Sequence, residues 1–126
     1  MNISDTIINL AVNEALKTDY FWKVGCVIFK GKKIISKGHN YPHKSVKKLH
    51  PQFQNYKGSI HAEVDAIIKA KTSLKGSYML VLRISKGNRF KISKPCKNCM
   101  KYIEHVGIKK IYYSISEYPY FDFEKL

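Results

Sequence analysis

Two short stretches of the chain carry the side chains that are best suited to chemistry. Cys96 and Cys99 stand in KPCKNC, directly after Pro95, while His61 and Glu63 stand in HAE. Two thiolates and one imidazole can fill three positions around a zinc ion and leave the fourth for water, which is typical of a catalytic zinc site. Glu63 is too close to His61 in sequence to be a comfortable co-ligand, so we expect it to carry protons beside the open position.

Two cysteines at this spacing have other uses as well. They can be a redox-active pair, which needs a thioredoxin-like strand before it, or half of a structural zinc site completed by a histidine. Neither use gives Glu63 a role. A second metal site formed by His39, His43 and His50 is a further hypothesis, although a solvated or nucleic-acid-facing loop explains them more simply. Cys26 stands in VGCVIF and is predicted to be a small core residue.

Both stretches are predicted to open helices. Residues 61–71 carry small apolar residues at helical spacing. Residues 96–106 follow a proline, which favours the first helical turn, and precede Gly107, a common C-cap residue. Helix N-termini favour thiolate anions through the helix dipole. If the two helices are neighbours on a sheet, their first turns bring the metal-binding side chains together.

The remaining pattern predicts an α/β fold. The apolar and turn signals place a helix over 3–18 with Ser4 or Asp5 as cap, a hairpin over 24–29 and 34–38, a polar loop over 39–59, a central strand over 78–84, a short strand over 89–92 and another strand over 108–115. Crossovers through helices make the later strands parallel. We therefore expect three α-β-α layers, with a central mixed sheet of about five strands and helices on both faces, in a single domain over residues 1–126.

The charge of the chain points to anionic partners. Lys and Arg number 23 against 9 Asp and Glu, which gives a formal net charge of +14 over 126 residues. Nucleotides and nucleic acids are the ligands that such a surface favours. The sequence shows neither a signal peptide pattern nor an apolar run of membrane-spanning length, so a cytoplasmic protein without a membrane partner is expected.

H-x-E followed by P-C-x-x-C is typical of zinc-dependent nucleobase deaminases. The chain resembles the cytidine/deoxycytidylate deaminase superfamily over about residues 5–115. VGCVIFKGKKIISKGHN resembles the first hairpin of that family, and SIHAEVDAI resembles its first zinc helix. SKPCKNCMKYIEHVGIKKIYYS resembles the second zinc helix and the following strand, and is most similar to the deoxycytidylate branch.

The resemblance implies one catalytic Zn²⁺ ion and a set of residue roles. The zinc ligands would be His61, Cys96 and Cys99. Glu63 would be the general acid/base, which moves a proton from the attacking water to the ring nitrogen and then to the departing amine. Cytosine would lose its C4 amino group as ammonia and become uracil. The Asn40 side chain would contact the sugar, and the Ala62 backbone N–H would bind the base carbonyl.

Two segments depart from the family pattern. SKGNRFKISK stands where the family usually has only a few residues, and it could grip phosphate or be a solvated edge hairpin. Its basic residues are Lys86, Arg89, Lys91 and Lys94. The last segment, SEYPYFDFEKL, has room for one strand or an aromatic tail. Its aromatic residues could stack on bases, or cover the sheet edge or a subunit interface: Tyr118, Tyr120, Phe121 and Phe123.

These features favour a deaminase of a free deoxycytidine nucleotide similar to dCMP. The alternative is a cytosine deaminase that acts on single-stranded DNA or RNA, which the +14 charge favours. An adenosine deaminase of transfer RNA and a non-catalytic nucleic-acid-binding module are further hypotheses. Self-association into a homo-oligomer is also expected from the resemblance.

Overall fold

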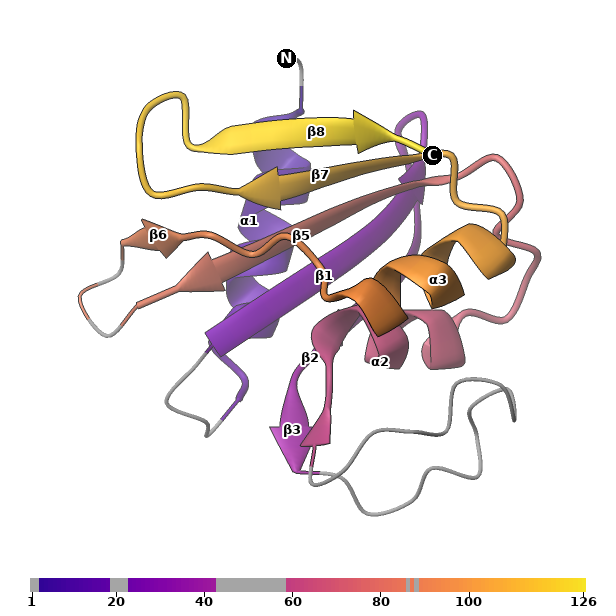
Figure 1. Cartoon of the computed structure of the whole chain (residues 1–126), viewed down its shortest axis with the longest axis horizontal. Coiled ribbons are helices and arrows are strands. Elements are labelled where there is room, and N and C mark those ends of the chain that lie inside the picture. The colour runs from indigo at the N-terminus through magenta and orange to yellow at the C-terminus, as the bar shows by residue number, and fades with distance from the viewer. Residues whose placement is uncertain (1–2, 19–22, 43–58, 86, 88) are drawn as a thin grey trace.

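The computed structural model describes residues 3–18, 23–42, 59–85, 87 and 89–126. Its described elements form three layers, with a sheet between helices on either face (Figure 1). Helix α1 (Asp5–Ala15) covers one face, while α2 (Ala62–Lys69) and α3 (Lys97–His105) cover the other. The predicted α-β-α architecture is confirmed.

Six of the described strands make up the central sheet, in the order β2-β1-β5-β7-β8 with β6 added beside β5. Their bounds are β1 (Lys23–Lys30), β2 (Lys33–His39), β5 (Tyr78–Ile84), β6 (Phe90–Lys91), β7 (Lys110–Ser114) and β8 (Phe121–Lys125). The pairing of β5 with β7 is parallel and the other pairings are antiparallel, so the sheet is mixed as expected. β5 is the central strand, and the main path holds the expected five strands.

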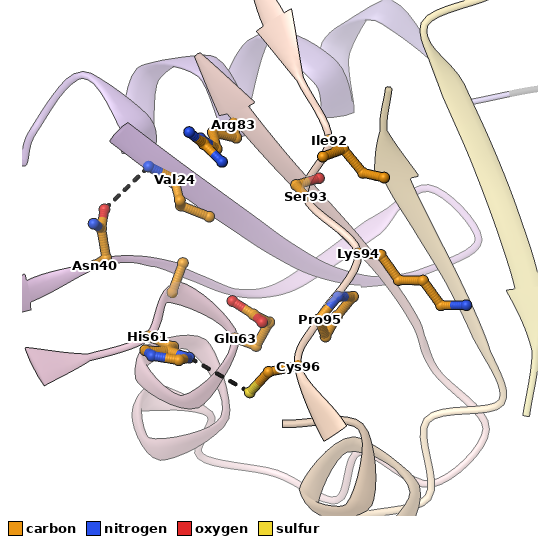
Figure 2. Close-up of a pocket in the computed structure, with 11 residues that line it drawn as sticks. Val24, Asn40, His61, Glu63, Arg83, Ile92, Ser93, Lys94, Pro95 and Cys96 are labelled. Carbon is orange, nitrogen blue, oxygen red and sulfur yellow. Dashed lines mark hydrogen bonds between the residues drawn. The ribbon is translucent and has the colours of Figure 1, made fainter. Parts of the chain in front are cut away.

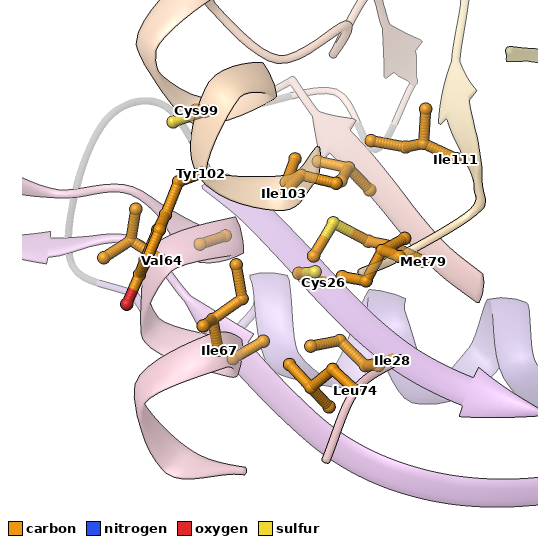
Figure 3. Packing of buried hydrophobic residues seen from close by; sticks show 14 residues of the cluster. Cys26, Ile28, Val64, Ile67, Leu74, Met79, Cys99, Tyr102, Ile103 and Ile111 are labelled. Carbon is orange, nitrogen blue, oxygen red and sulfur yellow. The ribbon is translucent and has the colours of Figure 1, made fainter. Parts of the chain in front are cut away.

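The side chains of β5 alternate between two hydrophobic clusters. Met79 and Val81 join Cys26 in the cluster beneath α2 and α3, whereas Leu80 and Leu82 face α1. Figure 3 shows Cys26 and Met79 packed among the apolar residues of the first cluster. The prediction that Cys26 is a core residue is confirmed. A continuous apolar strand forms here because both faces are covered.

Glycines allow the helices to lie directly on the sheet. A Cβ atom built at Gly38 would lie 2.7 Å from the backbone oxygen of Ala62 in α2. One built at Gly25 would lie 2.8 Å from the backbone nitrogen of Ala15 in α1. Real Cβ atoms essentially never approach so closely, so these two positions fix how α1 and α2 are seated.

The predicted ends of several elements differ from the observed ones. α1 is shorter than residues 3–18, and Ser4 is its N-cap, with its Oγ accepting a hydrogen bond from the Ile7 backbone N–H at 3.3 Å. The stretch predicted as loop contains two paired two-residue strands, β3 (Tyr41–Pro42) and β4 (Ser59–Ile60). Residues 43–58, with the predicted loop histidines His43 and His50, lie outside the described residues.

The final segment forms a strand, one of its two predicted forms. β8 pairs antiparallel with β7 at the edge of the sheet, and Phe121 is buried in the α1-side cluster. Tyr118, in contrast, is 84% exposed.

None of the described helices has the length and apolar character that a membrane-spanning segment requires.

Candidate active site

His61 and Cys96 are the N-cap residues of α2 and α3. Neither side chain makes a capping hydrogen bond to its own helix. Their donor atoms instead lie close to each other, between the two helix starts. Cys99 lies in the first turn of α3 and is fully buried. The helix starts predicted from the sequence thus place all three side chains at one point between the helices.

The three donor atoms are spaced to hold one metal ion. His61 Nδ1 lies 3.2 Å from Cys99 Sγ and 3.9 Å from Cys96 Sγ. All three donor atoms lie within 4.8 Å of one another. Tetrahedral zinc with ordinary bond lengths separates a sulfur and a nitrogen ligand by about 3.5 Å, so the residues present fit a zinc ion. Within the described parts of the chain, this is the one such group of three.

The protonation of the site suits a cation. Hydrogen bonds from Cys99 and His61 to the Cys96 sulfur lower the pKa of that thiol to about 3. The same contact with Cys96 raises the pKa of His61, and the nearby Glu63 charge adds to that rise against the effect of burial. Cys26, deep in the core, has its pKa raised well above the usual thiol value by burial and by nearby carboxylates. The thiols of Cys96 and Cys26 thus have opposite chemistry, and only the first is suited to metal binding.

Glu63 follows in the first turn of α2 and lines a pocket of about 340 Å³ together with His61 and Cys96 (Figure 2). The residue is 5% exposed, and burial raises the pKa of its carboxyl group. A buried carboxyl group with a raised pKa can both accept and donate a proton. The structure therefore brings the predicted proton carrier to the same pocket as the predicted metal ligands.

Asn40 and Ala62 also line this pocket. Asn40 Oδ1 accepts a hydrogen bond from the backbone N–H of Val24 at 3.0 Å, which fixes the side chain at the end of the first hairpin. His39, the neighbouring residue, points elsewhere: its Nδ1 lies 3.3 Å from Glu14 Oε1 on α1. Among the described residues it belongs to no group that could hold a metal, which leaves the hypothesis of a second site without support there.

The basic insertion contributes less to the pocket than its charge suggested. Among its described basic residues, Lys94 alone lines the pocket, and Figure 2 shows its side chain directed away from Glu63. Its Nζ lies 3.4 Å from Glu124 Oε2 on β8. Arg89 and Lys91 are exposed and are not lining residues. Lys86 lies outside the described residues.

Several lining residues were not among the predicted site residues, and Arg83 is the one of them that carries a charge. It is the last residue but one of β5, the strand that the sequence predicts to be central. Its spacing from Met79 and Val81 by even numbers of residues puts it on the α2–α3 side of the sheet. A single charge on that face of an apolar strand was the signal that could have identified it.

Comparison with known proteins identifies the family of the chain. Residues 1–115 match the family described as the cytidine and deoxycytidylate deaminase zinc-binding region. The chain belongs to this family. Zinc is therefore its cofactor, and the group formed by His61, Cys96 and Cys99 could hold the ion.

One relative of this deaminase-family chain is a deaminase from a bacterium. An uncharacterized deaminase in the luxG 3′ region of Aliivibrio fischeri is 34% identical over 93 residues, which are 71% of this chain and 56% of that protein. The chain thus spans little more than half the length of this relative.

Two solved structures share the fold at low sequence identity. The cytidine deaminase from Burkholderia pseudomallei has a TM-score of 0.62 and 14% identity, with 98% of this chain and 93% of that chain covered. The dCMP deaminase from the cyanophage S-TIM5, in complex with dCMP and dUMP, has a TM-score of 0.58 and 21% identity, with 90% and 85% covered. These two likenesses confirm the cytidine-deaminase-like fold.

Proposed function

We propose that residues 1–126 form a single zinc-dependent deaminase domain that converts cytosine to uracil in a deoxycytidine nucleotide similar to dCMP. One observation carries the proposal: a buried Glu63 faces the same pocket as a His–Cys–Cys group of metal-ligand geometry. Family membership and the dCMP and dUMP bound to the cyanophage dCMP deaminase support the choice of substrate.

In the proposed mechanism Glu63 transfers protons throughout. A zinc ion, when bound, lowers the pKa of water and supplies a nucleophile near neutral pH. Glu63 accepts a proton from the attacking water and delivers it to N3 of cytosine. It then takes the remaining proton from the new C4 hydroxyl group and passes it to the amino group at C4, which leaves as ammonia while the C4 oxygen becomes the uracil carbonyl. Burial of Glu63 favours this role because a raised pKa lets the carboxyl group hold a proton between the two steps.

Two further residues orient the substrate in this proposal. Ala62 is the first residue of α2, where backbone N–H groups have no partner within the helix, so its N–H can donate to the base carbonyl. Asn40 is fixed by its hydrogen bond with Val24 and lines the pocket, so its amide can contact the sugar.

The test uses zinc-loaded protein, dCMP as substrate and uracil nucleotide formation measured by mass spectrometry. Glu63→Gln should lower kcat by roughly 10²- to 10⁴-fold while the zinc content stays unchanged. Glu104→Gln is the matched control, because Glu104 is exposed on α3 and should leave the rate unchanged. A wild-type protein that binds zinc but deaminates no cytosine compound would contradict the proposal, as would full activity in Glu63→Gln.

A polynucleotide substrate is the second candidate. Arg89 and Lys91 are exposed on the segment that continues into the pocket wall at Ile92, and the whole chain has a net charge of +14. The same assay with a cytosine-containing single-stranded oligonucleotide, in DNA and RNA form, separates the candidates. Conversion of the oligonucleotide but not of dCMP would favour this second function.

A further inference from the structure

We propose that Arg83 is the anion-binding residue of this pocket, and that it selects substrates carrying a phosphate group over neutral nucleosides. This inference rests on the proposed deaminase function and adds a specificity-determining residue to it. The chemical class it would bind is a phosphate monoester or diester attached to the sugar of the cytosine substrate.

The position of Arg83 follows from strand pairing. Arg83 of β5 is opposite Val24 of β1, and both line the pocket. The alternation that buries Met79 and Val81 beneath α2 and α3 continues to Arg83 at the carboxyl end of the strand. In open α/β sheets, ligands bind at the carboxyl ends of strands. Arg83 is therefore placed where the sheet face opens into the pocket.

The backbone of Arg83 is held on both sides. It pairs with Val24 in β1 and with Lys91 in β6, and its N–H donates to Ser114 Oγ at 3.0 Å. Ser114 is fully buried. These bonds fix the position of the Arg83 backbone, so its side chain extends from a defined point of the sheet at the pocket.

Two serines also fix the segment of the pocket wall that lies beside Arg83. Ser93 Oγ donates to the Val81 carbonyl at 2.8 Å, and the Ser93 N–H donates to the Ser114 carbonyl at 3.1 Å. These bonds hold Ile92 and Ser93 against the sheet next to Arg83. At Ile92 and Ser93 the insertion therefore forms part of the pocket wall and is held to the sheet by hydrogen bonds.

The charges of the pocket are divided between its two sides. In Figure 2, His61, Glu63 and Cys96 lie on one side, while Arg83, Ile92 and Ser93 lie on the other. The Lys94 ammonium group, the other basic group on that second side, is directed toward Glu124. Guanidinium is always charged and binds phosphate oxygens in a bidentate manner. A substrate with its base beside Glu63 would therefore present its phosphate to Arg83.

The experiment compares dCMP with deoxycytidine, which lacks the phosphate. Arg83→Gln should lower kcat/KM for dCMP by about 10- to 100-fold, which is the range for losing hydrogen bonds to a charged group. The value for deoxycytidine should stay within about twofold, and Arg83→Lys should restore part of the loss on dCMP. Lys101→Gln is the matched control, since Lys101 is exposed on α3 and does not line the pocket. Equal losses on both substrates, or no loss on dCMP, would overturn the proposal.

Binding measurements separate this inference from the proposed function. Calorimetry with dUMP and deoxyuridine needs no turnover, and Arg83→Gln should weaken dUMP binding by about 10- to 100-fold without changing zinc content or melting temperature. Undiminished dUMP binding would refute the role of Arg83 even in an active enzyme. Weakened dUMP binding to a protein that deaminates nothing would uphold the role of Arg83 while the deaminase proposal fails.

A single-stranded oligonucleotide with one cytosine distinguishes the two kinds of phosphate group. A larger effect of Arg83→Gln on the oligonucleotide than on dCMP assigns the contact to a phosphodiester. A larger effect on dCMP assigns it to a phosphate monoester.

Discussion

Cys96 and Cys99 occupy unlike surroundings, although they are neighbours on one turn of α3. Cys96 is exposed at the N-cap, whereas Cys99 is fully buried against the helix. His61 Nδ1 lies close to both sulfurs. The group of three donor residues is therefore open to solvent at Cys96 and closed to it at Cys99.

Removal of either thiol should remove the metal. We expect Cys96→Ala and Cys99→Ala to reduce the bound zinc from about one ion per chain to a small fraction of that, because two protein ligands rarely hold zinc alone. Inductively coupled plasma mass spectrometry of the purified variants measures this. Cys26→Ala is the control, since Cys26 is buried in the core. Zinc retained in both site variants would show that the metal binds elsewhere.

At the scale of elements, the site depends on how closely α2 lies on β2. Gly38 of β2 faces the backbone of α2 near Ala62 and Ala66. A methyl group there must push away the helix that carries Glu63. Overpacking of this kind usually costs about 1–3 kcal/mol.

Gly38→Ala should therefore destabilise the protein by about that amount and weaken zinc binding at the same time. Gly87→Ala is a matched control, because a Cβ at Gly87 meets nothing within 4 Å. Urea denaturation and competitive zinc titration of both variants provide the measurements. A Gly38→Ala protein with wild-type stability and zinc affinity would show that α2 can shift without cost.

A carboxylate joins α1 to the end of the first hairpin. The Glu14 side chain is 4% exposed, and it contacts Lys17 as well as His39. Burial opposes ionisation of Glu14, but the hydrogen bonds from Lys17 and His39 outweigh it and lower its pKa below the ordinary value of 4.5. Glu14 thus contributes stability that is present above that value and is lost as the pH falls through the lowered pKa.

Glu14→Gln should lower the free energy of unfolding by about 1–3 kcal/mol at pH 7. The difference from wild type should shrink as the pH falls below about 4.5. Denaturation curves at a series of pH values test this, with the exposed Glu104→Gln as control. A difference that stays constant with pH would mean that the Glu14 charge has no part in stability.

Much of this arrangement could be predicted from the sequence, because its signals are local. Pro95 and Gly107 limit α3, and HAE and PCKNC lie at helix starts, so the metal donors follow from short-range rules. The orientation of Lys94 could not be foreseen, because it depends on Glu124, which reaches the same place only through the pairing of β8 with β7. The role of Arg83 in the pocket likewise needed the register of β5 with β1.

For the whole molecule, net charge governs long-range encounters and the pocket governs selection. The charge of +14 attracts any phosphate-bearing ligand, whatever its sequence or size. Tyr118 and Phe123 are exposed near the β8 edge, so base stacking and self-association through this edge both stay predictions.

Binding of a cytosine-free single-stranded oligonucleotide should therefore depend strongly on salt. If four phosphates are contacted, affinity should fall by about 50-fold between 50 and 200 mM salt. Fluorescence anisotropy at several salt concentrations gives the slope, and Arg83→Gln should leave it nearly unchanged. Affinity that does not vary with salt would exclude a purely electrostatic surface.

The absence of side-chain caps on α2 and α3 has a consequence for the protein in zinc-poor conditions. Both helices begin at a residue that makes no side-chain capping hydrogen bond, and His61 Nδ1 of one helix start lies 3.9 Å from Cys96 Sγ of the other. A bound ion would link the N-terminal ends of α2 and α3, which are distant in sequence. Chelation should then loosen both ends together, and the amides of residues 62–65 and 97–100 should exchange with deuterium earlier than those of β5. The zinc supply would therefore affect the stability of the protein against unfolding as well as its catalytic rate.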